Sequence, residues 1–288
     1  MKLIFDLFRI KQWVKNLFLL IPAFFAGSIF EHGKLQTLTL GIVAFCFIAS
    51  AIYLINDYRD RASDRMHPRK QFRPIASGKV SSITVFILSI LLVLGGLSIA
   101  FFLNTIYLIL LLTYLSINIG YSFGLKNIPI LDLFIVASGF VIRVHSGGVL
   151  ADVPVSHWLS IMILLLALFI IIAKRRDDLI LQEETGADLR KVSKSYNLEF
   201  INSSITLISS VTVVAYIMYT VSPEVSMRLK SQYLYTTTIF VIAGILRYLQ
   251  ITFVEKRSGS PTEIFLKDKF ILITVMAWVI CFYFLIYF

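Results

Sequence analysis

The chain has 288 residues, of which 58% are hydrophobic and 15% are charged, and its mean hydropathy is +0.83. This composition excludes an ordinary soluble enzyme and indicates an integral membrane protein. The formal net charge of +10 would suit a nucleic-acid binder, but the basic residues follow the apolar segments in the manner of a membrane protein, so we expect no nucleic-acid partner.

The apolar residues form about nine uncharged or nearly uncharged segments long enough to cross roughly 30 Å of hydrocarbon as helices. In chain order they cover residues 14–30, 36–56, 81–103, 105–121, 131–150, 156–173, 200–221, 233–252 and 269–288. Barrel strands would show short alternating segments instead of these continuous runs. The sequence therefore predicts an all-α, polytopic membrane protein, with residues 1–288 forming one transmembrane domain.

The first of these segments is predicted to remain in the protein as a span. It continues past the length of a signal peptide and has no small-residue cleavage site before Glu31. Cys46 and Cys281 both fall inside predicted spans. We therefore expect neither a disulfide framework nor a thiolate metal site.

The basic residues are distributed unequally between the two sides of the predicted spans. If the N-terminus is cytoplasmic, the opposite side holds only Lys34, Arg228 and Lys230, while Arg143 lies inside a span and every other lysine and arginine is cytoplasmic. This asymmetry predicts a multi-pass protein of the cell inner membrane with cytoplasmic catalytic loops. Basic charge on that face would attract an anionic substrate or a lipid headgroup.

The stretch NDYRDRASD, residues 56–64, directly follows the second apolar segment. On an α-helix, Asp57, Asp60 and Asp64 are related by i, i+3 and i+7, so their carboxylates project from one face. Carboxylates so close repel one another unless a cation lies among them, and Mg²⁺ favours such oxygen ligands and shares them with substrate phosphates. Asn56 can add an amide oxygen or donate to a phosphate. A solvated loop at the end of a span would explain the bases here, but not three aspartates on one helical face.

Basic side chains of the kind that bind phosphate lie among and after these aspartates. They are Arg59, Arg61, Arg65, Arg69, Lys70 and Arg73. Acids for a metal ion and bases for phosphate together predict a metal–diphosphate site.

The roles of two further basic residues can be interpreted in more than one way. Arg143 lies inside the fifth span, and an intramembrane arginine is a functional candidate. It could meet a phosphate in a central cavity, pair with Asp132, or snorkel to an interface. Lys126, beside a short turn, could reach a substrate phosphate or a lipid headgroup.

The motif NDYRDRASD fits the N-D-x-x-D-x-x-x-D pattern of the UbiA-type superfamily of intramembrane prenyltransferases, and about nine helices in a bundle is that superfamily's architecture. More specifically, the chain resembles the decaprenyl-phosphate phosphoribosyltransferase branch. The motifs that carry this resemblance are RIKQWVKN (9–16), HPRKQFRPIASG (67–78), YSFGLK (121–126), KRRDDL (174–179), RYLQ (247–250) and GSPTEIFLKD (259–268).

The resemblance implies that Asp57, Asp60 and Asp64 are the catalytic magnesium and diphosphate site, with Asn56 beside them. It makes Lys15, Lys70 and Arg73 candidates for holding phosphate groups. Prenyltransferases of the superfamily usually carry a second motif of roughly D-x-x-x-D. This chain instead has three bases and two acids there, which suits further phosphate groups: Lys174, Arg175, Arg176, Asp177 and Asp178.

The expected activity is thus Mg²⁺-dependent transfer of a 5-phosphoribosyl group from phosphoribosyl diphosphate to a polyprenyl phosphate of the decaprenyl type. One alternative is a UbiA-type prenyltransferase that moves an isoprenyl group from its diphosphate to an aromatic or other small acceptor. Another is a transporter of an anionic lipid or phosphate compound, although inverted repeats are not evident. A homo-oligomer stays open.

Overall fold

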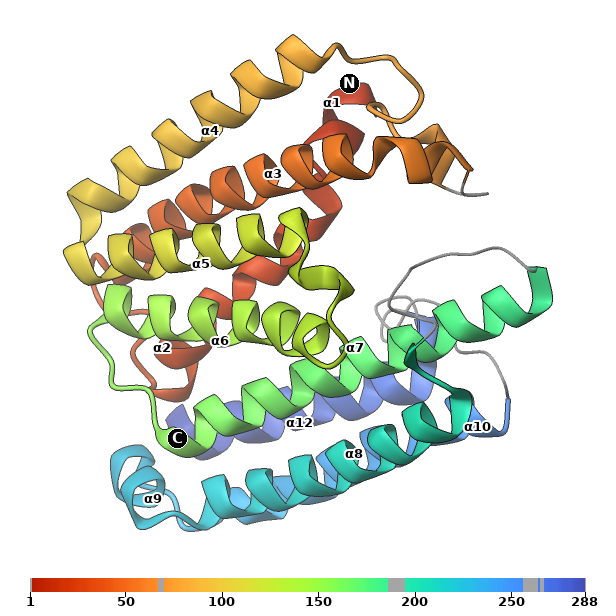
Figure 1. The fold of residues 1–288 in the computed structure, drawn as a ribbon. Coiled ribbons are helices and arrows are strands. Elements are labelled where there is room, and N and C mark those ends of the chain that lie inside the picture. The colour runs from red at the N-terminus through yellow and green to blue at the C-terminus, as the bar shows by residue number, and fades with distance from the viewer. Residues whose placement is uncertain (1, 67–69, 186–194, 256–263, 265–266, 288) are drawn as a thin grey trace. The chain divides into compact units, whose positions relative to one another are not determined.

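The computed structural model describes residues 2–66, 70–185, 195–255, 264 and 267–287, and Figure 1 shows them as helices joined by short connections. No strand occurs within these ranges. Eight helices in them are long and apolar enough to cross a membrane. The prediction of an all-α, polytopic membrane protein is therefore confirmed.

These eight helices correspond to eight of the predicted spans. They are α3 (Lys34–Met66), α4 (Ser82–Leu103), α5 (Thr105–Phe123), α6 (Leu131–Ala151), α7 (His157–Thr185), α8 (Leu198–Val221), α10 (Thr238–Phe253) with the preceding 3-10 helix η5 (Leu234–Thr237), and α12 (Lys269–Tyr287). The shorter helices are α1 (Lys2–Leu7), η1 (Ile10–Leu20), α2 (Ile21–Phe25), η2 (Lys70–Phe72), η3 (Leu125–Asn127) and α9 (Pro223–Leu229). Both α3 and α7 continue beyond their apolar parts, so the charged residues that follow those two spans are helical.

The first predicted span, residues 14–30, differs from the structure. The chain there forms the 3-10 helix η1 and the short helix α2 rather than one long α-helix. At roughly 2.0 Å per residue in a 3-10 helix and 1.5 Å in an α-helix, the two pieces together extend about 30 Å. The expected count of nine long transmembrane helices is therefore not confirmed, and the described ranges contain eight.

The contacts of η1 with α3 explain its 3-10 form. Trp13 Nε1 donates to Ser50 Oγ at 3.0 Å, and Asn16 Nδ2 donates to Cys46 Sγ at 3.1 Å. Leu19, six residues after Trp13, is fully buried. Three residues per turn place these side chains on one edge, whereas an α-helix would turn Leu19 about 120° away from Trp13.

The same three-residue repeat divides the rest of η1 into two other edges. On one, Phe18 packs edge to face on Phe140 of α6, with ring centroids 5.1 Å apart, and Lys15 precedes Phe18 by one turn. The other is exposed and carries Lys11, Val14 and Leu17. The face of η1 that meets α6 thus presents a lysine beside an aromatic contact.

Gly147 of α6 allows η1 to approach closely. A Cβ atom at this position would overlap the backbone of Leu19. Because backbone atoms cannot rotate away as a flexible side chain does, we expect Gly147→Ala to destabilise the protein by at least about 3 kcal/mol, near the upper end for overpacking. Thermal unfolding in detergent should show a Tm lower by about 6 °C or more.

The matched control for this substitution is Gly244→Ala in α10. The nearest atom to a Cβ there, Thr274 Cγ2, is 3.9 Å away, an ordinary contact. This variant should melt at or slightly above the wild-type temperature, since alanine favours a helix. Equal Tm values for Gly147→Ala and the wild type would contradict the close approach of η1 and α6.

The described chain divides into two compact units. The first combines Met1–Phe24 with Ser28–Val155, and the second combines Phe25–Gly27 with Ser156–Phe288. The expectation of one domain over residues 1–288 stays a prediction. Both cysteines are free, as the sequence indicates.

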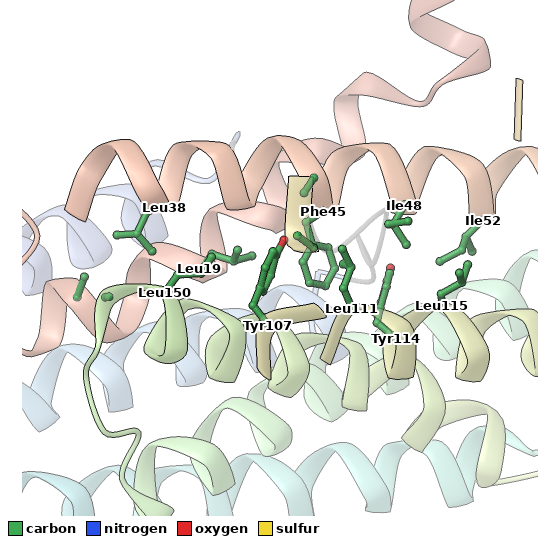
Figure 2. Close-up of a cluster of buried hydrophobic side chains, with 14 residues drawn as sticks. Leu19, Leu38, Phe45, Ile48, Ile52, Tyr107, Leu111, Tyr114, Leu115 and Leu150 are labelled. Atoms are coloured by element: carbon green, nitrogen blue, oxygen red, sulfur yellow. The ribbon is translucent and has the colours of Figure 1, made fainter. Parts of the chain in front are cut away.

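The core of the first unit lies between α3 and α5 (Figure 2). Phe45, Ile48 and Ile52 of α3 face Tyr107, Leu111, Tyr114 and Leu115 of α5. The buried Tyr107 hydroxyl donates to the Gly41 carbonyl at 2.7 Å, so its polar atom is satisfied within the apolar layer. Packing against α5 holds the helix that continues into the aspartate motif.

The second unit is built from α7, α8, α10 and α12, with an aromatic core around Trp278. The Trp278 indole donates to the Tyr216 hydroxyl at 2.7 Å. Arg247, in the RYLQ motif, donates from Nη2 to Asp268 at 2.8 Å and from Nη1 to Glu255 at 2.7 Å. The pair with Asp268 joins α10 to the residue that precedes α12. The segment 259–268 is mostly outside the described residues.

Candidate functional site

The aspartate motif forms the last turns of α3, so the predicted helical register is observed. Asp57 and Asp64 have only 7% and 5% of their side chains exposed, whereas Asp60 has 28% exposed. All three carboxylates are paired with basic side chains. Burying charges at this density is favourable only with such compensation.

Arg73 bridges the two buried carboxylates. Its Nη1 lies 3.0 Å from Asp57 Oδ1 and 2.6 Å from Asp64 Oδ2. The same Asp57 carboxylate also accepts from Arg9, whose Nε is 3.0 Å from Oδ2 and whose Nη2 donates to Oδ1. Two guanidinium groups therefore neutralise Asp57 in a charge-assisted, partly bidentate manner.

Asp60 has a different environment on the same helix face. Its Oδ1 accepts from the Lys126 ammonium, and its Oδ2 accepts from Asn56 Nδ2 at 3.2 Å. The Asn56 Oδ1 atom is buried and has no hydrogen-bond partner among the described residues. An amide oxygen left in this way beside a carboxylate is an available ligand for a cation or for a donor on a substrate.

The donor set fits Mg²⁺ in chemistry. Asp57, Asp60, Asp64 and Asn56 Oδ1 supply the hard oxygen atoms that this ion prefers. As placed, however, the described residues hold no three His, Cys, Asp or Glu side chains close enough to ligate one ion, because each carboxylate is turned toward a basic partner. A metal ion would therefore have to replace some of these partners.

Arg143 lies in the middle of α6 with 4% of its surface exposed. Its Nε donates to Asn16 Oδ1 at 2.8 Å, Nη1 to the Gly139 carbonyl at 2.7 Å, and Nη2 to the Tyr114 hydroxyl at 2.9 Å. All three acceptors are neutral.

Aromatic rings complete this environment. The Arg143 Cζ atom lies 4.8 Å from the ring centroids of Phe45 and Tyr114 and 5.7 Å from that of Phe140. The predicted alternatives of snorkelling and of pairing with Asp132 are both wrong: the side chain is buried, and no ion pair with Asp132 occurs among the described residues. The reason is that Asn16 and Tyr114 supply acceptors from η1 and α5.

Lys15 of η1 lies within electrostatic reach of the Arg143 and Arg9 guanidinium groups. It is partly buried and has no hydrogen bond or ion pair with the described residues. Unlike Arg9, Arg73 and Lys126, it is not neutralised by an aspartate.

The other predicted site residues lie elsewhere in the two units. Arg65 donates from Nε to the Ala76 carbonyl at 2.9 Å and so holds the following loop. Lys70 begins η2, and Arg69 is outside the described residues. In the first unit the structure thus brings Asn56, Asp57, Asp60, Asp64, Arg73 and Lys126 into one cluster, with Lys15 and Arg143 along the neighbouring stretch of η1 and α6.

The KRRDDL segment belongs to α7 in the second unit. Lys174 is exposed, whereas Arg175 and Arg176 are buried. Arg175 Nη1 lies 3.5 Å from Asp178 Oδ2, and Arg176 Nε donates to Asn202 at 2.9 Å. All the charged residues of this segment therefore lie on α7, within the second unit.

The sequence did not indicate three residues of this region: Arg9, which pairs with Asp57 of the cluster, and Asn16 and Tyr114, which accept hydrogen bonds from Arg143. Arg9 adopts a left-handed backbone conformation with φ 51° and ψ 47°, which is uncommon for a residue with a side chain. Arg9 and Asn16 are the first and last residues of the RIKQWVKN motif, so that motif could have indicated them as candidate site residues. Nothing in the apolar run around Tyr114 distinguishes it.

The fold and this cluster define a class: a helical, multi-pass membrane protein in which three carboxylates at the end of a span are paired with arginine and lysine side chains. The pattern of the UbiA prenyltransferase family matches residues 18–179. Among curated relatives, decaprenyl-phosphate phosphoribosyltransferase of Mycolicibacterium smegmatis is 38% identical over 94% of this chain and 88% of its own length. The protein of the same name from Corynebacterium glutamicum is 34% identical over 95% and 83%.

Among solved structures, a UbiA homolog from Archaeoglobus fulgidus bound to GPP and Mg²⁺ has a TM-score of 0.74, 21% identity and 98% coverage of both chains. This likeness shows the shared fold. The chain belongs to the UbiA prenyltransferase family, and it is a transferase. That result removes the transporter alternative.

Proposed function

We propose that this protein transfers a 5-phosphoribosyl group from phosphoribosyl diphosphate to a polyprenyl phosphate, releasing diphosphate. The observation that carries the proposal is the cluster in which Asp57, Asp60 and Asp64 are each held by an arginine or lysine. A metal-bound diphosphate could exchange with these partners, because it offers cations to the acids and oxygens to the bases. The nearly full-length similarity to the mycobacterial and corynebacterial enzymes supports this choice of substrates.

In this proposal Asp57, Asp60, Asp64 and Asn56 Oδ1 would hold Mg²⁺. When bound, the ion would neutralise charge on the departing diphosphate and act as a Lewis acid. Arg9, Arg73 and Lys126, once released from the aspartates, donate to diphosphate oxygens. Their positive charges thereby stabilise the leaving group as the bond between ribose C1 and the diphosphate oxygen breaks.

The new bond forms between C1 and an oxygen of the lipid phosphate. A phosphate monoester is already anionic near neutral pH, so the chain does not need to supply a strong general base. Its residues instead position the two anions and compensate their charge. Oxocarbenium character on the ribose resembles that of glycoside cleavage.

The eight membrane-spanning helices suit an acceptor whose tail lies in the bilayer. We propose that the N-terminus and the ends of the spans bearing Asp57 and Lys174 face the cytoplasm at the inner membrane, since the basic residues are concentrated there. Lys70, Lys174, Arg175, Arg176 and Asp178 remain proposed substrate-binding residues.

A second candidate is transfer of an isoprenyl group to an aromatic acceptor. The 4-hydroxybenzoate octaprenyltransferase of Serratia proteamaculans is 31% identical to this chain over 54% of it. The similarity is confined to about half of the chain, whereas the phosphoribosyltransferases align over nearly all of it. We therefore prefer phosphoribosyl transfer.

Purified protein in detergent with Mg²⁺ distinguishes the two candidates. One mixture contains labelled phosphoribosyl diphosphate and polyprenyl phosphate; the other contains labelled prenyl diphosphate and 4-hydroxybenzoate. We expect labelled product only in the first, extractable into the lipid phase, and its loss when EDTA removes the metal. Product formed only in the second mixture would overturn the proposed substrates.

A further inference from the structure

Lys15 and Arg143 bring hydrogen-bond donors and positive charge, and neither forms an ion pair with an acid among the described residues. Arg143 uses three donors on neutral oxygens, and a guanidinium has five. Lys15 has three donors and makes no hydrogen bond or ion pair with the described residues. Tyr114 accepts from Arg143, which leaves its own hydroxyl proton free to donate.

The geometry of η1 sets this neighbourhood apart from the aspartates. Arg9, directly before η1, pairs with Asp57, whereas Asn16 within η1 hydrogen-bonds to Cys46 and Arg143. Asp57 and Cys46 are separated by about three turns of α3. Arg9, Arg73 and Lys126 neutralise the three carboxylates, so the charges of Lys15 and Arg143 are left over.

Two like charges in a largely apolar part of a membrane protein are costly without an anion. The anion that fits best should carry close to two negative charges and several acceptor oxygens. A phosphate monoester has a charge of about −1.5 to −2 near neutral pH and three terminal oxygens. A carboxylate or a phosphodiester carries only one negative charge.

We propose that Lys15 and Arg143, with the Tyr114 hydroxyl, form a binding site for a phosphate monoester that is separate from the aspartate cluster. This inference rests on the proposed function, whose two substrates both contain such a group: the 5-phosphate of the donor and the phosphate of the lipid acceptor. The site recognises the chemistry that the two share. Which of them occupies it is decided by the experiment.

The experiment measures binding to purified protein in detergent containing EDTA, so that the aspartate cluster holds no divalent ion. Ribose 5-phosphate represents the donor, and farnesyl phosphate represents the acceptor; ribose and farnesol serve as probes without phosphate. We expect Lys15→Gln to weaken binding of one of the two phosphates by about 10-fold or more, as for loss of a charge-assisted hydrogen bond. The ligand affected identifies the source.

Two control variants separate the site from general effects. Lys11→Gln removes a lysine from the exposed edge of the same helix and should bind both ligands as the wild type does. Lys15→Arg keeps the charge and should retain most of the affinity. Ligand-free Lys15→Gln should melt at or above the wild-type temperature, because the substitution relieves repulsion with Arg143 and Arg9.

Wild-type affinity of Lys15→Gln for both phosphates would overturn the inference, as would a Tm of the ligand-free variant well below that of the wild type. Failure of the proposed function would be seen in a different measurement from failure of this site. Absence of phosphoribosyl transfer by the wild type, with binding still dependent on Lys15, would reject the reaction and keep the site. Normal transfer with binding independent of Lys15 would reject the site and keep the reaction.

Discussion

Asp60→Asn should reduce phosphoribosyl transfer by at least about 1,000-fold while leaving the protein folded. The substitution preserves shape but replaces a carboxylate that we propose as a metal ligand, and several kcal/mol of leaving-group stabilisation correspond to about three orders of magnitude in rate. The structural cost should be small, since Asp60 is the most exposed of the three aspartates and its ion pair with Lys126 is partly solvated. Initial rates at saturating Mg²⁺ and thermal unfolding check both parts.

Asp6→Asn is the matched control, because Asp6 is an exposed aspartate on α1 and should keep wild-type activity. Mn²⁺ binding measured with diphosphate present adds a readout apart from turnover: Asp60→Asn should bind Mn²⁺ at least about 10-fold more weakly. Full activity in Asp60→Asn would refute the metal assignment. Loss of activity with unchanged Mn²⁺ binding would reduce Asp60 to a partner of Lys126.

The spans that sequence predicted best are those whose boundaries depend on local chemistry. Residues 81–103 and 105–121 correspond closely to α4 and α5, because Asn104 alone separates them. Its side chain accepts from the backbone of Ile106 and Tyr107, which caps α5. Likewise, helical periodicity correctly predicted that the three aspartates share one face, because α3 continues past its apolar part through Met66.

The parts that sequence did not predict depend on contacts between distant segments. Hydropathy cannot separate a 3-10 helix from an α-helix, and η1 is selected by Ser50 and Cys46 of α3 and by the close approach at Gly147. The environment of Arg143 combines η1, α5 and α6, which no local pattern joins. The ion pairs of the three aspartates were also not predicted. Their spacing in the sequence indicated a metal ion among the carboxylates, but it could not show which arginine and lysine side chains pair with them.

That pairing gives the cluster a property which a simple metal site lacks. The basic residues that would bind diphosphate are the same ones that pair with the three aspartates. If the aspartates hold Mg²⁺ as proposed, a guanidinium would have to leave Asp57 or Asp64, and a diphosphate bound together with the ion would give that guanidinium a new anionic partner. We therefore expect metal and diphosphate to bind cooperatively.

Arg73→Met should separate the two halves of this exchange. Arg73 donates to both Asp57 and Asp64, so its removal leaves two buried carboxylates short of positive charge while Arg9 still holds Asp57. Without diphosphate, the variant should bind Mn²⁺ at least about 10-fold more tightly than the wild type, because a competing cation is gone. Transfer activity should nevertheless fall by about 100-fold or more, since a donor to the leaving group is also gone.

Electron paramagnetic resonance of Mn²⁺, with and without added diphosphate, measures the first effect, and initial rates measure the second. Lys79→Met, which removes an exposed cation from the same loop, should change neither. The ligand-free Arg73→Met protein should also melt below the wild type and recover when Mn²⁺ is added, as expected when a metal ion compensates the two carboxylates. Weaker Mn²⁺ binding by the variant in the absence of diphosphate would mean that Arg73 supports the metal site instead of competing with it, and the proposed exchange would then be wrong.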